Sequence, residues 1–589
     1  MSEERTALGE LARRRGLFFP ANEAYGGTAG FYVYGPTGAA IKRNLEDAWR
    51  DRFAVREGNM EIDAPTIMPE PVFVASGHLD GFDDMLVECA ECGESHRADH
   101  LVEGATDIED AETLPPEEVA ELIADLDLAC PNCGSPLAGQ DVTEFNLMFG
   151  TNIGPGSSAP GYLRPETAQG IFVEFPRLKE YAREQLPFGV TQVGRAYRNE
   201  ISPRRGLVRV REFTQAELEL FVDPERDEAD VSSVADVPLT LYPEDQQQAE
   251  GQDYVETTVR EAVEEGIVAV DWIAYYLGVA RQWYEAIGVD MDRFRFRQHL
   301  PGERAHYAAD CWDAEAEVGG DWVEIAGFAY RGDYDLSAHA EHADAEFTVF
   351  QQYDETVTVE RAAVDPDMSV LGPEFGGEAA AVADALADLA ERDPDALDGT
   401  TDGTIVVEVD GEDHEVPAEA VDFSVVEETV SGEHVTPHVV EPSFGVDRTV
   451  YTVLAHALRE DEVDEEARTR LALPPAMAPT FVGVFPLMDK DGLGERADEV
   501  ATRLRNRGLS VAYDDSGSIG RRYRRQDEVG TPYCVTVDYE SLSDGAVTLR
   551  ERDSAEQRRV AIEDLPEVLS ALRAGERAFS DVGAAVADA

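Results

Sequence analysis

The 589-residue chain has a formal net charge of −72, because 121 Asp and Glu outnumber 49 Lys and Arg, and its lysines are only Lys42, Lys179 and Lys490. No stretch approaches the roughly 20 apolar residues of a membrane-spanning helix, and the start MSEERTALGE lacks the apolar run of a secretory signal, so we expect a cytoplasmic protein without membrane contact. The acids are spread along a chain that is 43% hydrophobic, which disfavours a disordered acidic tail and favours a halophile protein of several domains folded in molar salt.

The first predicted elements are a loop and a helix. A Gly-rich passage, YGGTAGFYVYGPTG, occupies residues 25–38, and a helix-favouring run follows from Ala39 to Phe53. Glycines that permit tight turns, placed just before a periodic run, are typical of a loop that leads into a helix.

Two cysteine pairs follow, separated by an acidic segment. They are CAEC, with Cys89 and Cys92, and CPNC, with Cys130 and Cys133. Four thiolates in two Cys-x2-Cys pairs are the ligand set of a structural zinc site, although the spacer is longer than in a usual ribbon. Disulfides are disfavoured in a cytosol, and four unrelated buried thiols are the remaining alternative.

The passage GRAYRNEISPRRGLVRVREFTQAELELF, residues 194–221, predicts a β-hairpin with ISPRRG as its turn. Two-residue alternation places cations, an aromatic ring and carboxylates on one face: Ala196, Arg198 and Glu200 on the first strand, and Arg209, Arg211, Phe213, Gln215 and Glu217 on the second, opposite Val208 and Val210. Guanidinium groups bind phosphate, an aromatic ring stacks on a nucleotide base, and a carboxylate pairs with an ammonium group. The alternative is an ordinary charged strand facing solvent.

Between this hairpin and the next motif the chain is acidic. Residues 224–320 predict acidic helices, and residues 351–435 predict an acidic insertion with Gly turns and alternating Val/Glu strands. In EPSFGVDRTVY, residues 441–451, Gly445 precedes apolar residues at helical spacing, so Arg448 is expected in the first turn of a helix.

After Pro474 and Pro475 the pattern changes to alternating strands and a helix that Gly508 closes. This alternation predicts a small, separate α/β domain at residues 475–589. Its RRYRR run mixes cations with a ring, as recognition of single-stranded RNA requires, and the alternative is an exposed basic helix. The residues expected to contact RNA are Arg521, Arg522, Tyr523, Arg524 and Arg525.

YRNE and GVDR resemble motifs 2 and 3 of the class II aminoacyl-tRNA synthetases. The blocks YGGTAGFYVYGP, RADHL, YLRPETAQGIF, YRNEISPR, VREFTQAE, EPSFGVDR and DDSGSIGRRYRRQDEVGTPY, in this order, are similar to signatures of homodimeric glycyl-tRNA synthetases of the archaeal and eukaryotic type. The resemblance covers nearly the whole chain except the acidic insertions.

The resemblance implies an α+β fold, in which an antiparallel sheet flanked by helices carries acidic insertions and a C-terminal α/β anticodon-binding domain. The expected divisions are the N-terminal core with a dimer-interface motif (1–88), the Cys-rich insertion (89–140), the core with motif 2 (141–223), a helical acidic insertion (224–320), core (321–350), an acidic insertion (351–435), the core with motif 3 (436–474) and the anticodon-binding domain (475–589).

The resemblance also implies roles for single residues. Arg198 and Arg448 would bind the α- and γ-phosphates of ATP, and Glu324 would help to hold magnesium. The expected ATP-binding residues are Arg198, Asn199, Glu200, Val208, Arg209, Val210, Arg211, Glu212, Phe213, Glu324, Ile325, Gly445, Val446, Asp447 and Arg448. The expected glycine-binding residues are Arg97, Glu166, Phe213, Thr214, Gln215, Ala216, Glu217, Glu441, Pro442, Ser443, Phe444 and Gly445.

The resemblance implies a reaction that uses glycine, ATP and the glycine tRNA as substrates. It also implies a homodimer whose interface lies around residues 39–65. Glycine offers a cation and no side chain, so discrimination must come from excluding every larger amino acid. Two alternatives stay open: a class II synthetase for another amino acid, and a synthetase-like protein without catalytic activity that only binds nucleic acid.

Overall fold

The computed structural model describes residues 3–106, 108, 111, 114–155, 159–203, 206–249, 253–301, 310–392, 403–409, 412–463 and 465–586. The chain forms two compact units, one made of residues 1–347 with 436–589 and the other of residues 348–435. Among the described residues, no helix combines the length and the apolar character that a bilayer crossing requires.

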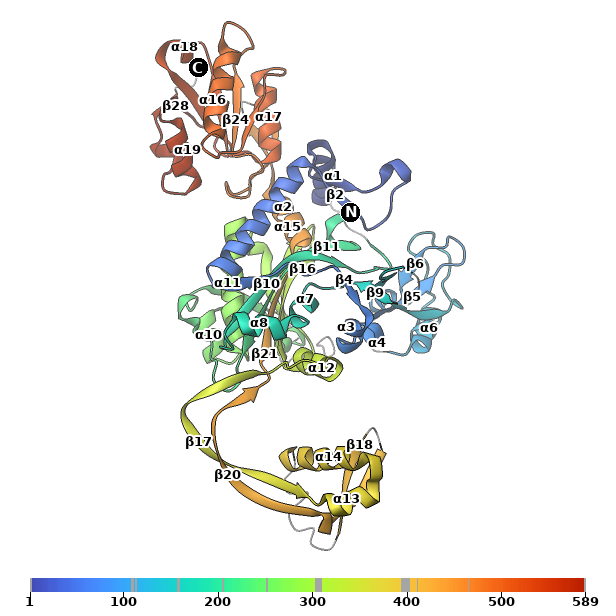
Figure 1. Cartoon of the computed structure of the whole chain (residues 1–589). Helices are drawn as coiled ribbons and strands as arrows, with labels where there is room; N and C mark the ends of the chain where they lie inside the picture. Colours follow the sequence, from blue (N-terminus) through green and yellow to red (C-terminus); the bar gives the residue numbers. More distant parts are fainter. Residues whose placement is uncertain are drawn as a thin grey trace. The chain divides into compact units, whose positions relative to one another are not determined.

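A nine-stranded sheet forms the centre of the larger unit (Figure 1). Neighbouring strands are antiparallel except for β12 with β14 and β10 with β3, which are parallel. In spatial order the strands are β13 (Val255–Thr258), β12 (Pro238–Tyr242), β14 (Phe294–Gln298), β15 (Asp310–Val318), β16 (Asp321–Gly332), β21 (His438–Gly445), β11 (Glu212–Val222), β10 (Phe188–Tyr197) and β3 (Met60–Glu61). This is the antiparallel sheet that the sequence predicts.

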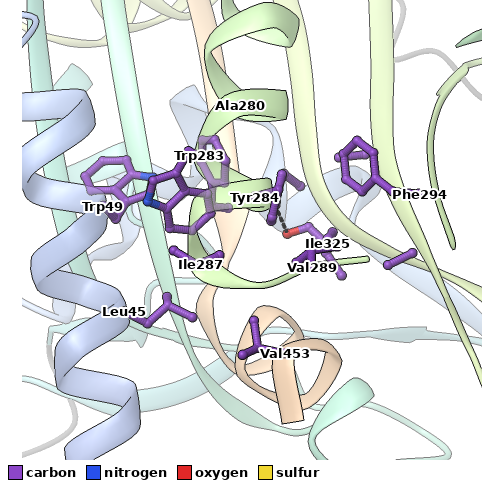
Figure 2. Packing of buried hydrophobic residues seen from close by; sticks show 14 of the residues in the cluster. Leu45, Trp49, Ala280, Trp283, Tyr284, Ile287, Val289, Phe294, Ile325 and Val453 are labelled. Atoms are coloured by element: carbon purple, nitrogen blue, oxygen red, sulfur yellow. Dashed lines mark hydrogen bonds between the residues drawn. The ribbon is translucent and has the colours of Figure 1, made fainter. Parts of the chain in front are cut away.

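Three helices pack their apolar sides on one face of this sheet: α2 (Pro36–Trp49), α11 (Asp271–Ile287) and α15 (Val446–Ala457). Trp49 of α2 and Trp283 and Tyr284 of α11, labelled in Figure 2, all pack against the Phe444 ring of β21, at 5.9, 5.4 and 5.9 Å between ring centres. The Tyr284 hydroxyl donates to the carbonyl of Ile325 on β16, at 3.4 Å. Burying each such large side chain contributes about 1.5–3 kcal/mol, so this layer holds β16 and β21 in a fixed position. The opposite face of the same strands is left for polar residues.

The prediction that residues 224–320 form a helical insertion is wrong, because this segment supplies β12, β13, β14 and β15 of the central sheet. Burial alternates strictly along Asp310–Val318, as it does in a strand with one face in the core. The frequent acids of the segment favoured a helical interpretation, although Asp313, Glu315 and Glu317 occupy the less buried positions of the β15 strand. α10 (Val259–Glu264) and α11 are the longest helices of the segment.

The cysteine-containing segment is a small module with its own apolar core, which includes Val87, Val119 and Ile123. Its sheet has the order β6-β5-β7, from β5 (Asp83–Glu88), β6 (Ser95–Arg97) and β7 (Val142–Asn146), and it carries α5 (Ala98–Glu103) and α6 (Pro116–Asp125). Other elements of the larger unit are α1 (Glu3–Arg15), β1 (Phe18–Pro20), β2 (Tyr32–Tyr34), β4 (Ile67–Pro69), α3 (Glu70–Ala75), α4 (His78–Gly81), β8 (Phe149–Asn152), β9 (Pro160–Leu163), α7 (Gln169–Phe172), α8 (Phe175–Tyr181), α12 (Tyr334–His342), β22 (Leu458–Val463) and β23 (Glu466–Leu471).

The smaller unit contains the predicted acidic insertion. A long antiparallel pair, β17 (Val349–Pro366) with β20 (Val421–Val435), leads to a core in which Leu371, Val382 and Leu386 are buried. Its other elements are α13 (Met368–Phe375), α14 (Ala379–Arg392), β18 (Thr404–Val409) and β19 (Glu412–Pro417).

The C-terminal part has the predicted α/β character. Its six-stranded sheet has the order β25-β24-β26-β27-β28-β29, and Gly508, at a φ of 78°, follows its first helix as expected. The elements are β24 (Val482–Pro486), α16 (Leu493–Arg505), β25 (Val511–Tyr513), α17 (Ile519–Val529), β26 (Tyr533–Val537), α18 (Ser541–Asp544), β27 (Ala546–Glu551), β28 (Gln557–Ala561), α19 (Leu565–Arg573) and β29 (Ala584–Ala585).

Candidate active site

A cavity of about 250 Å³ lies between the β10–β11 hairpin, β16, β21 and the start of α15. It brings together Arg198, Phe213 and Arg448, three side chains that the sequence predicts in one chamber. The complete lining is Arg198, Glu200, Leu207, Val208, Arg209, Val210, Phe213, Thr214, Gln215, Glu324, Ile325, Gly327, Ser443, Gly445, Asp447 and Arg448. Leu207 and Gly327 are the members that the sequence did not suggest.

The hairpin has the predicted strands but a longer connection. β10 ends at Tyr197 and β11 begins at Glu212, so Arg198 and Glu200 follow the first strand, and Arg209 and Arg211 precede the second. The expectation that these four residues lie on strand faces is therefore wrong. A 3-10 turn at Gly206–Val208 folds the connection over the cavity, and residues 204 and 205 of the predicted turn lie outside the described residues.

The Arg198 guanidinium lies 5.4 Å from the ring centre of Phe82 and 5.5 Å from that of Phe213. Its Nε donates to the carbonyl oxygen of Pro165 at 3.2 Å. Aromatic rings attract a cation without neutralising its charge, so the guanidinium keeps donors available for an anion in the cavity.

Arg448 stands in the first turn of α15, whose N-cap is Gly445, as predicted. Its Nε donates to the carbonyl of Val208 at 2.9 Å, and its Nη1 lies 3.0 Å from the carboxylate of the half-exposed Glu324. The Arg448 charge lowers the pKa of Glu324, despite partial burial that opposes the shift. Asp447 accepts from the backbone N–H of Thr214 and the hydroxyl of Tyr34, each at 2.5 Å, which ties the helix to β11.

Polar residues meet behind Ser443, where β11, β16 and β21 lie side by side. Ser443 pairs in register with Glu217 on one side and with Gly327 on the other. Glu217 accepts from the Ser443 hydroxyl at 2.7 Å, from the backbone N–H of Ala168 at 2.7 Å and from the Thr167 hydroxyl. Burial, and next the charge of Glu166, raises the pKa of Glu217.

Glu166 completes this acidic corner. Its carboxylate accepts from Gln169 at 2.9 Å and lies 3.7 Å from His78. Burial alone would raise the pKa of Glu166, but His78 and Arg331 act against burial and lower it. An ionised carboxylate beside Glu217 is what a small ammonium group would require.

Arg331 and Asp335 belong to the same polar cluster but were not foreseen from the sequence. Arg331 donates to Glu441 at 2.8 Å and to Asp335 at 2.6 Å and 2.8 Å. Burial raises the pKa of Glu441 to about 7, although Arg331 opposes this shift. The one local sign of this cluster was that Arg331 and Asp335 stand four residues apart at the end of a strand. This spacing does not indicate that Arg331 also binds Glu441.

Several predicted glycine-binding and ATP-binding residues face the core instead of the site. Ala216, Phe444 and Val446 are at most 1% exposed, and the Phe444 ring packs 5.4 Å from that of Trp283. Strand alternation explains this result, because Glu441, Ser443 and Gly445 share one face of β21 while Pro442 and Phe444 take the other.

Other predicted contact residues serve the frame of the site. Arg211 donates to the carbonyls of Ala29 and Glu200 at 3.1 Å and 2.8 Å, so it fastens the connection to the Gly-rich loop. Glu212 pairs with Arg195 at 3.6 Å, and the backbone of Asn199 donates to Leu147 at 2.8 Å. Asn199, Arg211, Glu212 and Glu217 do not belong to the lining of the smaller cavity.

Arg97, which the sequence predicts in the glycine pocket, instead lines a second cavity of about 430 Å³ whose lining includes neither Glu166, Glu217 nor Ser443. It pairs with Asp84 at 2.7 Å and with Asp99. The cysteine module contributes His96, Arg97, His100, Leu101 and Pro131 to this cavity. The rest of its lining is Ser202, Trp322, Val323, Val208, Arg209, Glu324 and Arg448. The last four of these residues also line the smaller cavity. The module therefore forms a wall next to the chamber of Arg448.

The four paired cysteines converge at the end of the module. Their Sγ atoms all lie within 4.8 Å of one another, with Cys89 to Cys133 at 3.6 Å and Cys92 to Cys130 at 3.7 Å. A tetrahedral zinc with Zn–S bonds of about 2.3 Å requires S···S separations of about 3.8 Å, so the donor set fits this metal. His96 Nε2 lies 3.2 Å from Cys130 Sγ, as an outer partner of a ligand does.

The RRYRR run forms part of α17, and most of it turns inward. Arg522 is 2% exposed and donates to the carbonyls of Pro486, Asp515 and Gly517, while the Tyr523 hydroxyl bonds to Thr536 at 2.5 Å. Arg524 pairs with Glu466 at 3.1 Å, and Arg525 pairs with Asp514. Burial of Arg522 argues against its predicted contact with RNA, because a 3.6-residue period cannot keep five consecutive residues on one face. Contact of Arg524 and Arg525 with RNA stays a prediction. Arg521 is the exposed member.

Comparison with known proteins agrees with this geometry. Residues 159–457 match the class II core domain of tRNA synthetases (G, H, P, S and T), and residues 482–572 match an anticodon binding domain. The glycine–tRNA ligase of Methanothrix thermoacetophila is 50% identical over 98% of this chain and 98% of its own length. Those of Methanothermobacter thermautotrophicus and Methanocaldococcus jannaschii are 47% and 45% identical over 97% and 95% of this chain, and 99% and 97% of their own lengths. The chain therefore belongs to the glycine–tRNA ligase family, within the class II tRNA synthetases.

Proposed function

We propose that this chain activates glycine with ATP and transfers it to the 3′ end of glycine tRNA. The observation that carries the proposal is the arrangement of two adjoining sites: Arg198, Phe213 and Arg448 line one cavity, and Ser443 links that cavity to Glu217. The first site has cations and a ring for a nucleotide, and the second has buried carboxylates for an ammonium group.

In the first step, the glycine carboxylate attacks the α-phosphorus of ATP and pyrophosphate leaves. In the second step, the terminal ribose hydroxyl of the tRNA attacks the glycyl carbonyl and adenylate leaves. Arg198 and Arg448 offset the charge on the phosphates, and Glu166 with Glu217 orients the ammonium group. Catalysis then comes from positioning and charge neutralisation, without a covalent enzyme intermediate.

The glycine pocket works as a steric sieve. Glu217 is held by Thr167, Ala168 and Ser443, so its carboxylate cannot move aside without losing hydrogen bonds. A buried, fully bonded wall tolerates little displacement, and an extra methyl group on the substrate is rejected by contact with it. This argument favours glycine over a larger amino acid.

Pyrophosphate exchange with each amino acid in molar potassium chloride tests the substrate. Exchange with glycine alone is expected, and exchange with another amino acid at a similar rate would favour the alternative synthetase. In Arg448→Ala, exchange is expected to fall at least about 100-fold, because removing one stabilising donor costs about 2.7–4 kcal/mol. Unchanged aminoacylation in this variant would show that Arg448 is not part of the site, whereas a wild type without exchange or aminoacylation would support the alternative of a non-catalytic RNA-binding protein.

Two metal ions belong to the proposal. Glu324 stands beside Arg448, where it would supply a carboxylate to magnesium, which is otherwise bound through substrate phosphates and water. Magnesium would offset phosphate charge. Cys89, Cys92, Cys130 and Cys133 would hold zinc as a structural ion, away from the chemistry.

We also propose a cytoplasmic homodimer in a halophile. Val55 is 72% exposed and Ile67 is 48% exposed, and both lie within six residues of β3 along the chain. β3 is an edge strand that pairs only with β10 among the described strands. Apolar side chains beside an unpaired edge favour association. For the tRNA, Arg521 is the remaining exposed cation of the RRYRR run.

A further inference from the structure

A fifth carboxyl group lies in the polar cluster, on Glu219. The residue is 0% exposed, and neither of its carboxyl oxygens has a hydrogen-bond partner among the described residues. It lies two residues beyond Glu217 on β11, so both side chains share one face of the sheet. No role in the reaction outlined above uses it.

Charged groups surround Glu219 on three sides. Glu217 precedes it on the same strand, Glu441 lies on the adjacent β21, and Arg331 of β16 and Asp335 of α12 complete the set. On β10 its register partner is the apolar Val190. Arg331 donates to Glu441 and Asp335, so the cation of the cluster is already engaged by two carboxylates.

A carboxylate in these surroundings would be an unpaired charge in a dry, acidic environment. Keeping such a charge buried costs far more free energy than protonating the carboxylate, so Glu219 takes up a proton. In agreement, burial, followed by the charges of Glu441 and Glu217, raises the pKa of Glu219 well above its usual value.

We propose that Glu219 is a positioning residue that holds a proton in the empty pocket, and that the ammonium group of glycine displaces this proton as it binds. The O–H bond of the carboxyl group breaks, the proton passes to solvent buffer, and the ammonium charge takes its place. The proposal rests on the placement of glycine beside Glu217.

The direction of the pH dependence follows from linkage. The bound ammonium cation favours the ionised form of a nearby acid, so a proton leaves when glycine binds. By linkage, a high proton concentration, which means a low pH, weakens glycine binding. Glycine affinity therefore rises with pH through the range in which Glu219 of the empty pocket still holds its proton. His78 lies 3.7 Å from Glu166, and Glu166 is already ionised at neutral pH because its pKa is lowered.

The first experiment asks whether Glu219 is neutral, without involving glycine. In infrared spectra of the full-length protein at pH 7 in molar potassium chloride, the difference between wild type and Glu219→Gln is expected to contain the C=O band of a protonated carboxyl group. A carboxylate band in its place would overturn the proposal and indicate an ionised Glu219 neutralised by a bound cation such as potassium.

The second experiment follows the Michaelis constant for glycine in pyrophosphate exchange from pH 6 to 9. In wild type, this constant is expected to fall about tenfold for each pH unit in the range where one proton is released, and in Glu219→Gln less than about threefold over the same range. Glu225→Gln, an exposed residue after the same strand, is the matched control and keeps the wild-type slope. A wild-type slope in Glu219→Gln would overturn the proposal.

A third measurement needs no variant, in case Glu219→Gln does not fold. Calorimetric titration of the wild type with glycine, in two buffers of different ionisation enthalpy, counts the protons released, and a release of up to about one per glycine is expected. No release, or uptake, would overturn the proposal. If Glu217→Gln leaves the glycine constant unchanged, the placement of glycine is wrong, whatever the infrared result for Glu219.

Discussion

At the scale of single residues, the same kind of side chain has opposite uses a few positions apart. Arg198 faces two aromatic rings and keeps free donors for an anion, whereas Arg211 spends its donors on the carbonyls of Ala29 and Glu200. Only the neighbours that the fold supplies separate a ligand-binding arginine from a structural one, because both guanidinium groups have the same intrinsic chemistry.

Glu217→Gln tests the ammonium site. The change keeps the shape of the side chain but removes its charge, so one charge-assisted hydrogen bond worth about 1.5–3 kcal/mol is lost. We expect kcat/KM for glycine to fall about 10- to 100-fold in pyrophosphate exchange, while the Michaelis constant for ATP stays within about twofold. A loss that affected ATP and glycine equally would contradict a specific role in glycine binding.

At the scale of elements, the cysteine module contributes residues to the wall of the cavity that adjoins the candidate active site. His96 contacts the sulfur of Cys130, while His96 and Arg97 line the cavity that also contains Arg448 and Glu324. A zinc ion held by the four thiolates would stabilise this small module, because binding energy of the ion is folding energy. In the proposal such an ion orders a wall of the site without entering the reaction.

Cys130→Ser tests the module. Protein purified in high salt is expected to contain one zinc per chain by metal analysis, and the variant is expected to lose it, with a lower melting temperature and greater proteolysis within the cysteine module. Cys534→Ser, in the buried core of the C-terminal sheet, is the matched control and should keep its zinc. Full zinc content in Cys130→Ser would show that the four thiolates do not form the metal site.

At the scale of the whole molecule, charge sets the conditions for folding. A net charge of −72 opposes compaction when the screening length is long, and many of the cations are already used in ion pairs such as Arg331 with Glu441. The screening length falls from about 10 Å at 0.1 M salt to about 3 Å at 1 M, so self-repulsion weakens steeply over this range.

Stability is therefore expected to depend on salt. Circular dichroism during heating should give a melting temperature that rises continuously from 0.1 M to 3 M potassium chloride, with the protein partly or wholly unfolded at the low end. A melting temperature that is the same at both ends would contradict adaptation to high salt.

The dimer proposal predicts a second response of the whole molecule. Val55→Asp places a charge on the apolar surface beside β3, and light scattering in molar potassium chloride should then find a monomer where the wild type is a dimer. Val406→Asp, which changes an equally apolar residue that is 52% exposed in the smaller unit, should remain a dimer. If Val55→Asp and Val406→Asp both remain dimers, the interface lies elsewhere.

Local spacing was enough to predict the elements that carry the active site. The hairpin around Arg198 and Phe213, the helix that begins after Gly445 and the C-terminal alternation of strands all follow from periodicity within one segment. Resemblance to a known family added the expectation that Glu217 and Ser443 belong to one glycine pocket, which no local pattern contains.

Tertiary structure alone decided which faces are buried and which charges meet. Within residues 224–320, β12, β13, β14 and β15 form because their apolar positions pack in the core of the central sheet, and Tyr523 turns inward because its hydroxyl bonds to Thr536 and its ring packs against Phe485. Arg331 and Glu219 belong to the polar cluster around Glu217 through neighbours such as Glu441, which lies more than 100 residues away along the chain. Spacing within a segment determines which side chains share a face, but the energy of a buried charge depends on groups that only folding brings beside it.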